Sequence, residues 1–143
     1  MEYTKIQGDL FKVDKDYALV HCISRDAKMG KGIAKTLVET FPDLKKDVLN
    51  QEPHIGDAIM HITNERVIFN LVTKPRYFHK PTYTTLTQSL MSLKDELKDH
   101  HIKRIAMPKI GSGLDRLDWE LVEKIIKDVF SDTDIEILVV EWK

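Results

Sequence analysis

The sequence lacks the features that would place it among membrane, secreted or disulfide-stabilised proteins. Cys22 is its single cysteine, so no disulfide can form within the chain, and we expect a cytoplasmic or otherwise intracellular, reducing setting. No apolar run approaches the ~18 residues that a membrane helix needs. Residues 1–9 are too polar for a secretory signal. We therefore expect no contact with membranes.

The sequence also has no excess of positive or negative charge. Lys and Arg total 22 and Asp and Glu total 23, which gives a formal net charge of -1. This balance argues against a general attraction to nucleic acid or anionic membranes, although a local basic site remains compatible with it. Hydrophobic residues make up 42% of the 143 residues and charged residues 31%, which is typical of one globular domain over residues 1–143.

Metal-binding patterns are also missing. The six histidines are scattered, and no spacing resembles a metal site, so we expect neither a metal nor a cofactor. Cys22 lies inside an apolar run, where a packed, inert thiol is favoured over a nucleophile.

Strand and helix patterns alternate along the whole chain. A helix is indicated by Ile33, Ala34, Leu37, Val38 and Phe41, with Pro42 ending it, and a short helix is expected over residues 44–50. Two later helices carry the stripes Leu86, Leu90, Leu93, Leu97 and Leu121, Ile125, Val129, with Asp118 as N-cap of the last. Strands are expected over residues 3–7, 18–23, 57–62, 66–73, 104–108 and 135–140. This order predicts an α/β protein, a three-layer α/β/α sandwich with a mixed, mostly parallel sheet.

Ligands in such sheets bind beyond the carboxyl ends of the strands, so the loops there are the candidate site. Gly30 and Gly32 precede a helix, where backbone N–H groups and the helix dipole attract an anion, although a tight turn explains them equally well. Gly111 and Gly113 form a second such loop. Two loops at one sheet edge suggest a diphosphate held from both sides. Neither loop matches the known phosphate-loop or dinucleotide patterns.

Lys74 and Asp115 follow two of these strands. A lysine at the end of an apolar strand is partly withdrawn from water, which favours a neutral, nucleophilic amine, although a solvated lysine is the commoner case. The alternatives for Asp115 are a solvated turn residue and an ion-pair partner of Arg116. Together, beside a bound sugar phosphate, the two side chains would form a nucleophile and a general acid–base.

These motifs resemble the macrodomain family, and more closely its terminal ADP-ribose protein glycohydrolase branch. The general resemblance rests on residues 8–10 (GDL), 21–24 (HCIS), 30–34 (GKGIA) and 108–114 (PKIGSGL). The branch is indicated by residues 71–74 (LVTK), 79–83 (HKPTY) and 113–117 (GLDRL). The similarity covers nearly the whole chain. An asparagine-rich segment common in other macrodomain hydrolases is replaced here by residues 22–24.

The resemblance implies an ADP-ribose site and a catalytic pair, Lys74 and Asp115. Asp9 would accept a hydrogen bond from the adenine amino group beside Leu10, and Ser24 would lie near the distal ribose. Trp142 aligns with an apolar residue near the adenine. The sequence alone does not decide whether Trp142 forms an aromatic wall of the adenine site or belongs to an exposed C-terminal tail. The two diphosphate loops would contribute Gly30, Gly32, Ile33, Ala34, Lys109, Gly111, Ser112, Gly113 and Leu114.

The implied activity is removal of ADP-ribose from modified acceptors through a lysyl–sugar intermediate. Glutamate or aspartate esters of proteins are the expected acceptors, with O-acyl-ADP-ribose as a further substrate. The alternatives are a non-catalytic ADP-ribose-binding module and an antitoxin-like hydrolase of ADP-ribosylated DNA. Pro75 and Ser112 depart from residues seen in relatives, which affects loop shape and acceptor choice. We expect a monomer.

Overall fold

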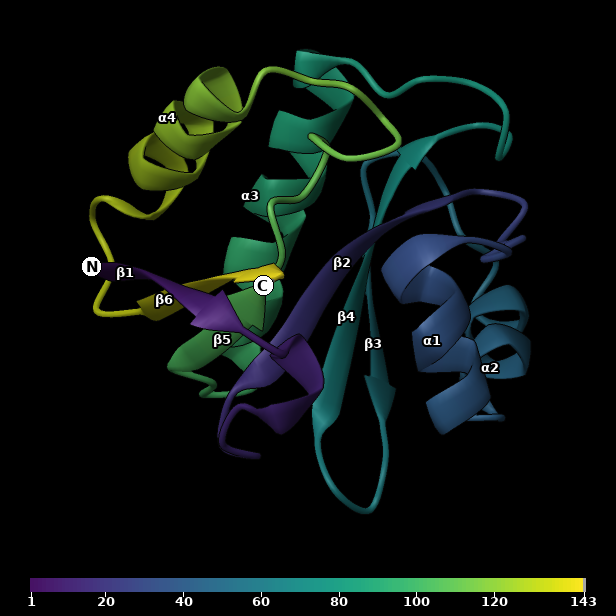
Figure 1. Ribbon diagram of the computed structural model, residues 1–143, viewed down its shortest axis with the longest axis horizontal. Coiled ribbons are helices and arrows are strands. Elements are labelled where there is room, and N and C mark those ends of the chain that lie inside the picture. Colours follow the sequence, from purple (N-terminus) through teal and green to yellow (C-terminus); the bar gives the residue numbers. More distant parts are fainter. Residues whose placement is uncertain (143) are drawn as a thin grey trace.

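The computed structural model describes residues 1–142 and contains a single six-stranded sheet with helices on both faces (Figure 1). Its elements, in chain order, are β1 (Glu2–Gly8), the 3-10 turn η1 (Leu10–Lys12), β2 (Ala18–Ser24), α1 (Gly32–Thr40), α2 (Leu44–Asn50), β3 (Ala58–Ile62), β4 (Val67–Lys74), α3 (Tyr83–Asp99), β5 (Arg104–Met107), α4 (Trp119–Phe130) and β6 (Glu136–Trp142). Each predicted element is present, and most boundaries differ from the prediction by one or two residues.

The strands lie in the order β1-β6-β5-β2-β4-β3. Every neighbouring pair is parallel except β3 and β4, which form an antiparallel hairpin. Helices α1 and α2 cover one face, and α3 and α4 cover the other, as Figure 1 shows. The predicted three-layer sandwich with a mixed, mostly parallel sheet is therefore confirmed.

Side chains alternate along the strands between two separate cores. On β4, Phe69 and Leu71 belong to the core under α3 and α4, whereas Ile68 and Val72 belong to the core under α1 and α2. This alternation follows from the two-residue period of a strand. Both faces of β4 are buried, which explains why its sequence is apolar throughout rather than alternating.

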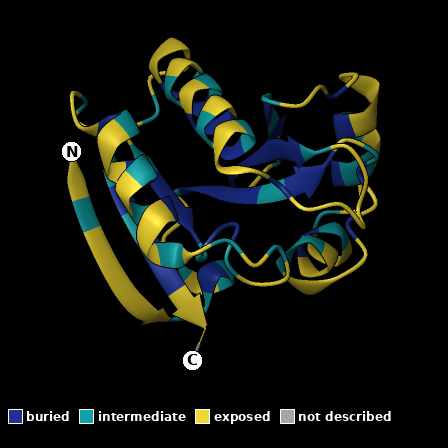
Figure 2. Ribbon diagram, turned by 90° about the horizontal axis from the view of Figure 1, so that it is seen from above, coloured by how far each residue is buried: buried dark blue, intermediate teal, exposed yellow. Residues whose placement is uncertain are grey.

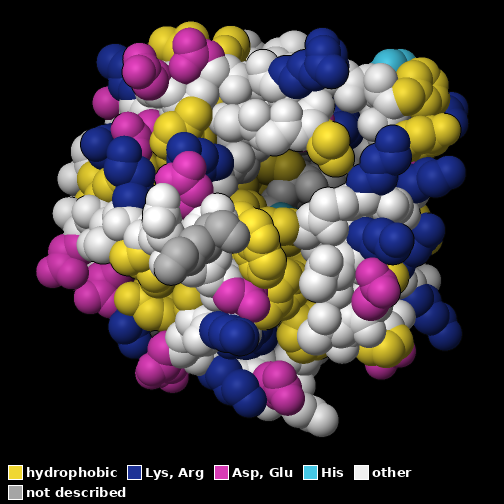
Figure 3. Space-filling view, viewed as in Figure 1, with side chains coloured by type: hydrophobic (Ala, Val, Ile, Leu, Met, Phe, Trp, Pro, Cys, Tyr) yellow, Lys and Arg dark blue, Asp and Glu magenta, His cyan; other side chains and the backbone are white. Residues whose placement is uncertain are grey.

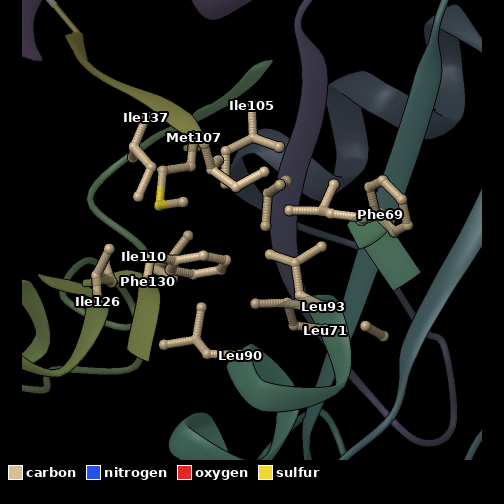
Figure 4. Close-up of a cluster of buried hydrophobic side chains, with 14 of the residues drawn as sticks. Phe69, Leu71, Leu90, Leu93, Ile105, Met107, Ile110, Ile126, Phe130 and Ile137 are labelled. Carbon is tan, nitrogen blue, oxygen red and sulfur yellow. The ribbon is translucent and has the colours of Figure 1, made fainter. Parts of the chain in front are cut away.

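The larger core lies between the sheet and the helices α3 and α4 (Figure 4). The leucine stripe of α3 is fully buried there, as predicted. Burial of each such leucine contributes about 1.5–3 kcal/mol relative to leaving it exposed. Thr82 and Thr85 form a capping box, which fixes where α3 begins, just after the loop that follows β4.

Helix α4 begins at Trp119 with Asp118 as its N-cap, as predicted, but its buried stripe is displaced by one residue. The fully buried side chains are Val122, Ile126 and Phe130, whereas Leu121 is 49% exposed. The predicted stripe of Leu121, Ile125 and Val129 has the same four-residue spacing as the buried one. The sequence offered two adjacent apolar stripes, and only packing against α3 decided between them.

Figure 2 shows the buried strands between helices whose outer faces are exposed. Strand β1, at one edge, is mostly exposed. Within residues 1–142, no helix has both the length and the apolar character that crossing a bilayer demands.

Candidate active site

The carboxyl ends of the parallel strands bring four loops to one edge of the sheet. These loops follow β1, β2, β4 and β5, and the end of β6 lies beside them. Figure 1 shows the loops after β2, β4 and β5 meeting at the top of the molecule. The predicted site residues come from these segments, so the fold gathers at one edge residues that are more than 100 positions apart.

Lys74 and Asp115 form a direct ion pair at this edge. Nζ of Lys74 donates to Oδ1 of Asp115 at 2.6 Å, and the two side chains are only 14% and 16% exposed. Lys74 is the last residue of β4, and Asp115 lies on the loop between β5 and α4. The sequence predicted that these two residues would meet, and the structure confirms it. Neither side chain is fully buried, so both keep some contact with solvent.

The loop that carries Asp115 is fixed by backbone conformation. Gly111 has φ +74°, and a Cβ there would lie 3.0 Å from the side chain of Leu117, so the position requires glycine. The N–H of Leu117 donates to the carbonyl of Gly111 at 2.7 Å, which closes the turn. Arg116, next to Asp115, is also left-handed with φ +60°. The loop therefore holds Asp115 in place at a cost in backbone strain.

The loop after β2 is organised around one carboxylate. Asp26 accepts hydrogen bonds from the Ser24 hydroxyl and from the backbone N–H of Tyr77 at 3.2 Å. Burial acts to raise the pKa of Asp26, but these hydrogen bonds, with one from the backbone of Lys28, outweigh it and lower the pKa. Asp26 thus ties the loop after β2 to the loop after β4. Asp26 was not among the predicted site residues.

The start of α1 is suited to an anion. Lys31 is its N-cap and makes no side-chain capping hydrogen bond, so the first-turn N–H groups are not satisfied by a cap. Gly32 has φ +61°, and a Cβ there would contact the side chain of Leu114 at 3.8 Å. The two glycine loops therefore approach each other, as predicted, with Leu114 between them.

A cleft of about 290 Å³ runs along this edge beside β6. It is lined by Leu10, Ile33, Pro108, Lys109, Ser112, Gly113, Val140, Glu141 and Trp142. Figure 3 shows a hollow with hydrophobic side chains along it. Its apolar lining can pack against the face of a flat aromatic ring such as adenine.

Six of the predicted binding residues line the cleft, and seven do not. Pro108, Val140 and Glu141 line it too but were not predicted, although Pro108 stood inside a recognised loop. Lys109 is engaged in an ion pair with Glu141 at 3.0 Å. The predicted residues outside the lining are Asp9, Ser24, Gly30, Gly32, Ala34, Gly111 and Leu114.

Asp9 and Trp142 lie at the end of the cleft formed by β1 and β6. Asp9 caps η1, with Oδ1 accepting from the N–H of Phe11 at 2.9 Å, and its other oxygen accepts no hydrogen bond from residues 1–142. Trp142 pairs with Gly8 in the sheet and is 68% exposed. It is therefore part of a strand that borders the cleft, rather than a free tail.

Cys22 lies beside the ion pair but is not a thiolate. Burial raises its pKa to about 12, and the charge of Asp115 raises it further than the charge of Lys74 lowers it. The predicted inert thiol is consistent with this environment. No group of three or more histidine, cysteine, aspartate or glutamate side chains within the described chain is arranged to hold a metal ion.

Known proteins and solved structures are similar to this chain over most of its length. The Macro domain family model matches residues 20–126. The ADP-ribose glycohydrolase OARD1 of Bos taurus is 43% identical over 136 residues, covering 95% of this chain and 89% of the relative. The DNA ADP-ribosyl glycohydrolase of Thermus aquaticus is 26% identical over 95% of this chain and 40% of its own length. Among solved structures, the macrodomain of Mycobacterium tuberculosis DarG superposes with a TM-score of 0.88 at 26% identity, covering 96% of each chain.

Proposed function

This chain belongs to the macro domain family, and from that premise we propose that it is an ADP-ribosyl hydrolase whose reaction is carried by Lys74 and Asp115. The observation that carries the proposal is the 2.6 Å contact between these side chains at the edge of the sheet where the glycine loops meet. Binding of ADP-ribose needs the loops but not a lysine paired with a carboxylate. The pair therefore favours an enzyme over a non-catalytic binding module.

ADP-ribose would extend along the cleft, with its adenine toward Trp142 and Leu10. The Asp9 oxygen that accepts no hydrogen bond from residues 1–142 would accept one from the adenine amino group. The diphosphate would lie between the loop of Gly30 and Gly32 and the loop of residues 111–114, where the N–H groups at the start of α1 stabilise negative charge. This orientation directs the distal ribose toward Ser24 and the ion pair.

In the first step, Lys74 acts as a nucleophile on the anomeric carbon of the distal ribose. Asp115 accepts a proton from the Lys74 ammonium group, which frees the lone pair on Nζ. A bond forms between Nζ and the anomeric carbon, and the bond from that carbon to the acceptor oxygen breaks. When the substrate is a glutamate or aspartate ester, the acceptor leaves as a carboxylate and takes up the proton held by Asp115, which is then a carboxylate again for the second step.

In the second step, water releases the sugar. Water adds to the anomeric carbon, the bond to Nζ breaks, and ADP-ribose leaves with a hydroxyl at that carbon. Asp115 moves the protons that water loses and Lys74 regains. Because the two residues are in contact, one carboxylate can serve both steps. The glycine loops supply positioning and charge stabilisation.

The chemistry of the pair sets few limits on the acceptor. Protein carboxylate esters and O-acyl-ADP-ribose are the substrates that we propose first, since a carboxylate is a good leaving group. ADP-ribosylated DNA is the second candidate, and the similarity to the DNA ADP-ribosyl glycohydrolase of Thermus aquaticus favours it. In either case the protein would act as a monomer without a metal.

Release of ADP-ribose from a panel of linkages tests this function. The panel contains glutamate and aspartate esters, O-acetyl-ADP-ribose, a serine ether, an arginine N-glycoside, and thymidine or guanosine in DNA. Release from at least one linkage in the presence of a metal chelator is the expected result. Tight ADP-ribose binding without release from any linkage would instead establish a binding module.

A further inference from the structure

A second hollow at the same edge of the sheet has no part in the proposed reaction. Its volume is about 320 Å³, and it is lined by Arg25, Glu52, Pro53 and His54. Arg25 directly follows β2, and the other three residues lie between α2 and β3. This hollow, which we call the outer pocket, shares no lining residue with the cleft beside β6.

The outer pocket adjoins Lys74 through the main chain. The N–H of Arg25 donates to the carbonyl of Lys74 at 2.8 Å. The segment before β3 runs beside the end of β4, where the N–H of Gly56 donates to the carbonyl of Val72 at 2.8 Å. The strand order β1-β6-β5-β2-β4-β3 therefore places the cleft toward β6, the catalytic pair at the ends of β2 and β4, and the outer pocket toward β3 (Figure 1).

This order decides which part of a substrate can reach the outer pocket. In the proposed complex, the adenine lies in the cleft and the distal ribose lies at Lys74. The diphosphate and the acceptor are carried by the two ring carbons on either side of the ring oxygen of that ribose, so the acceptor extends away from the cleft. The outer pocket is thus on the acceptor side of Lys74, and its volume suits one small group rather than a long segment.

The guanidinium group of Arg25 is oriented but mostly unoccupied. Its Nε donates to the carbonyl of Pro53 at 3.0 Å, and the side chain makes no ion pair within residues 1–142. Only one of its N–H donors is used, so the end of the planar group can still bind a carboxylate through two parallel hydrogen bonds. His54 is fixed beside it, because its backbone N–H donates to Asp57 at 2.7 Å.

Glu52 distinguishes a peptide from a nucleic acid. Its left-handed backbone, with φ +52°, is held by a hydrogen bond from its N–H to the carbonyl of Leu49 at 3.1 Å, and its carboxylate has no ion-pair partner in the described part of the chain. That carboxylate requires a donor from the ligand. Every peptide residue except proline supplies a backbone N–H, whereas phosphodiester links supply none and carry the same charge as Glu52.

We propose that the outer pocket binds an acidic residue of a protein acceptor, beside the residue that carries ADP-ribose. Arg25 pairs with the carboxylate of that acidic residue, and Glu52 accepts a hydrogen bond from its backbone N–H. The inference rests on the proposed function and narrows the acceptor to acidic protein segments. The catalytic pair acts on the ester, whereas the outer pocket selects the sequence around it.

Peptide binding to the Lys74→Ala variant, which leaves the ester intact, tests the outer pocket. Two fluorescent peptides carry the same ADP-ribosylated glutamate, flanked on both sides by aspartate in one and by asparagine in the other. By anisotropy we expect the aspartate peptide to bind about fivefold more tightly, the upper end for an exposed ion pair, because Arg25 is already oriented. Adding Arg25→Gln should remove this preference. Adding Arg76→Gln, an exposed arginine outside the pocket lining, is the matched control and should preserve it.

Hydrolysis separates selection by the outer pocket from a general structural role of Arg25. With Lys74 present, Arg25→Gln should lower kcat/KM for the aspartate peptide about fivefold, to the value for the asparagine peptide. Release from O-acetyl-ADP-ribose should not change, because acetate has no neighbouring residue, whereas a structural defect would lower the rates for all three substrates.

Three binding results would overturn the outer pocket. These are equal affinity of the two peptides for Lys74→Ala, a preference that survives Arg25→Gln, and tighter binding of an ADP-ribosylated oligonucleotide than of the aspartate peptide through Arg25. If the unaltered protein releases ADP-ribose from no substrate, the proposed function fails, whereas the comparison of the two peptides still decides the outer pocket.

Discussion

Strand β4 has a shielded cation at each end, and the two differ in what they contact. Arg66, just before the strand, is 7% exposed and donates to the backbone carbonyls of Val13 at 2.9 Å and Tyr17 at 3.4 Å. Lys74, at the other end, contacts the carboxylate of Asp115. Burial lowers the pKa of Arg66, but an arginine stays charged.

The different contacts suit Arg66 to a structural role and Lys74 to a catalytic one. Backbone carbonyls cannot accept a proton, so Arg66 only fastens β4 to the segment between η1 and β2. A carboxylate can accept one, so Lys74 can become a neutral amine without leaving its position. The chemical cation lies where parallel strands end and loops converge, whereas the structural one lies at the amino end of β4.

The comparison is sharpest when each cation is removed in turn. Lys74→Ala should reduce ADP-ribose release by at least about 10³-fold, because the nucleophile is lost, while much of the ADP-ribose binding remains. Release assays and calorimetric titration with ADP-ribose measure the two effects. Full activity in Lys74→Ala would show that water attacks directly, with Asp115 alone as the base.

Removing the partner of Lys74 tests whether the carboxylate moves protons. Asp115→Ala should lower turnover by about 10²–10⁴-fold, the usual range for a lost acid–base group. Lys74 can lose its proton to water instead and attack slowly, whereas release has lost its proton carrier, so a lysyl adduct with ADP-ribose should accumulate and appear as a mass increase of the intact protein. The double variant Lys74→Ala, Asp115→Ala should form none. An adduct that persists without Lys74 would assign the nucleophile to another residue, with Lys80 the nearest rival.

Arg66→Met should affect stability rather than turnover. The carbonyls of Val13 and Tyr17 lose their charged donor, which costs about 2–4 kcal/mol of unfolding free energy for two buried acceptors. Urea unfolding measures this loss. ADP-ribose release at a temperature where the variant is folded should match that of the unaltered protein. A selective loss of turnover would show that the two ends of β4 are coupled.

A third group that could carry positive charge, His21, extends the comparison to β2. It is buried beside Asn70, with Nε2 and Oδ1 2.5 Å apart, and burial lowers its pKa from 6.5 to about 4. Between pH 6.5 and 4, His21 therefore stays neutral in the folded protein, whereas it binds a proton in the unfolded chain. The free energy of unfolding therefore loses nothing to His21 above pH 6.5. It decreases as the pH falls toward 4, by about 2 kcal/mol at pH 5. In urea unfolding, His21→Gln should remove this part of the pH dependence.

The smallest expected effect lies at the adenine end of the cleft. Asp9→Ala should weaken ADP-ribose binding by about 1–3 kcal/mol, since a hydrogen bond to a charged acceptor is lost. The carboxylate also caps η1, so Asp9→Asn is the useful comparison, because asparagine keeps the cap. We expect weaker binding in both variants but a lower melting temperature only in Asp9→Ala. Unchanged affinity in both would reject the adenine assignment.

The sequence predicted the architecture because its signals are local. Thr82 before an apolar stripe, Pro42 after one, and the apolar run of β4 each act over a few residues, where periodicity and capping decide the structure. Lys74 and Asp115 were also found from sequence, because each follows a strand and parallel strands end at one edge. The resemblance then gave the pair a role that spacing does not provide.

Other features could be known only after the chain had folded. Asp26 looked like an ordinary loop residue, yet it joins the loops after β2 and β4. Val140 and Glu141 line the cleft from β6, a strand whose predicted bounds ended at residue 140 and which had no predicted part in the site apart from Trp142 beyond it. The choice of Val122 over Leu121 depended on α3. Local sequence thus determined the elements and the type of chemistry, whereas contacts between distant segments decided which side chains met, because those contacts exist only once the sheet has formed.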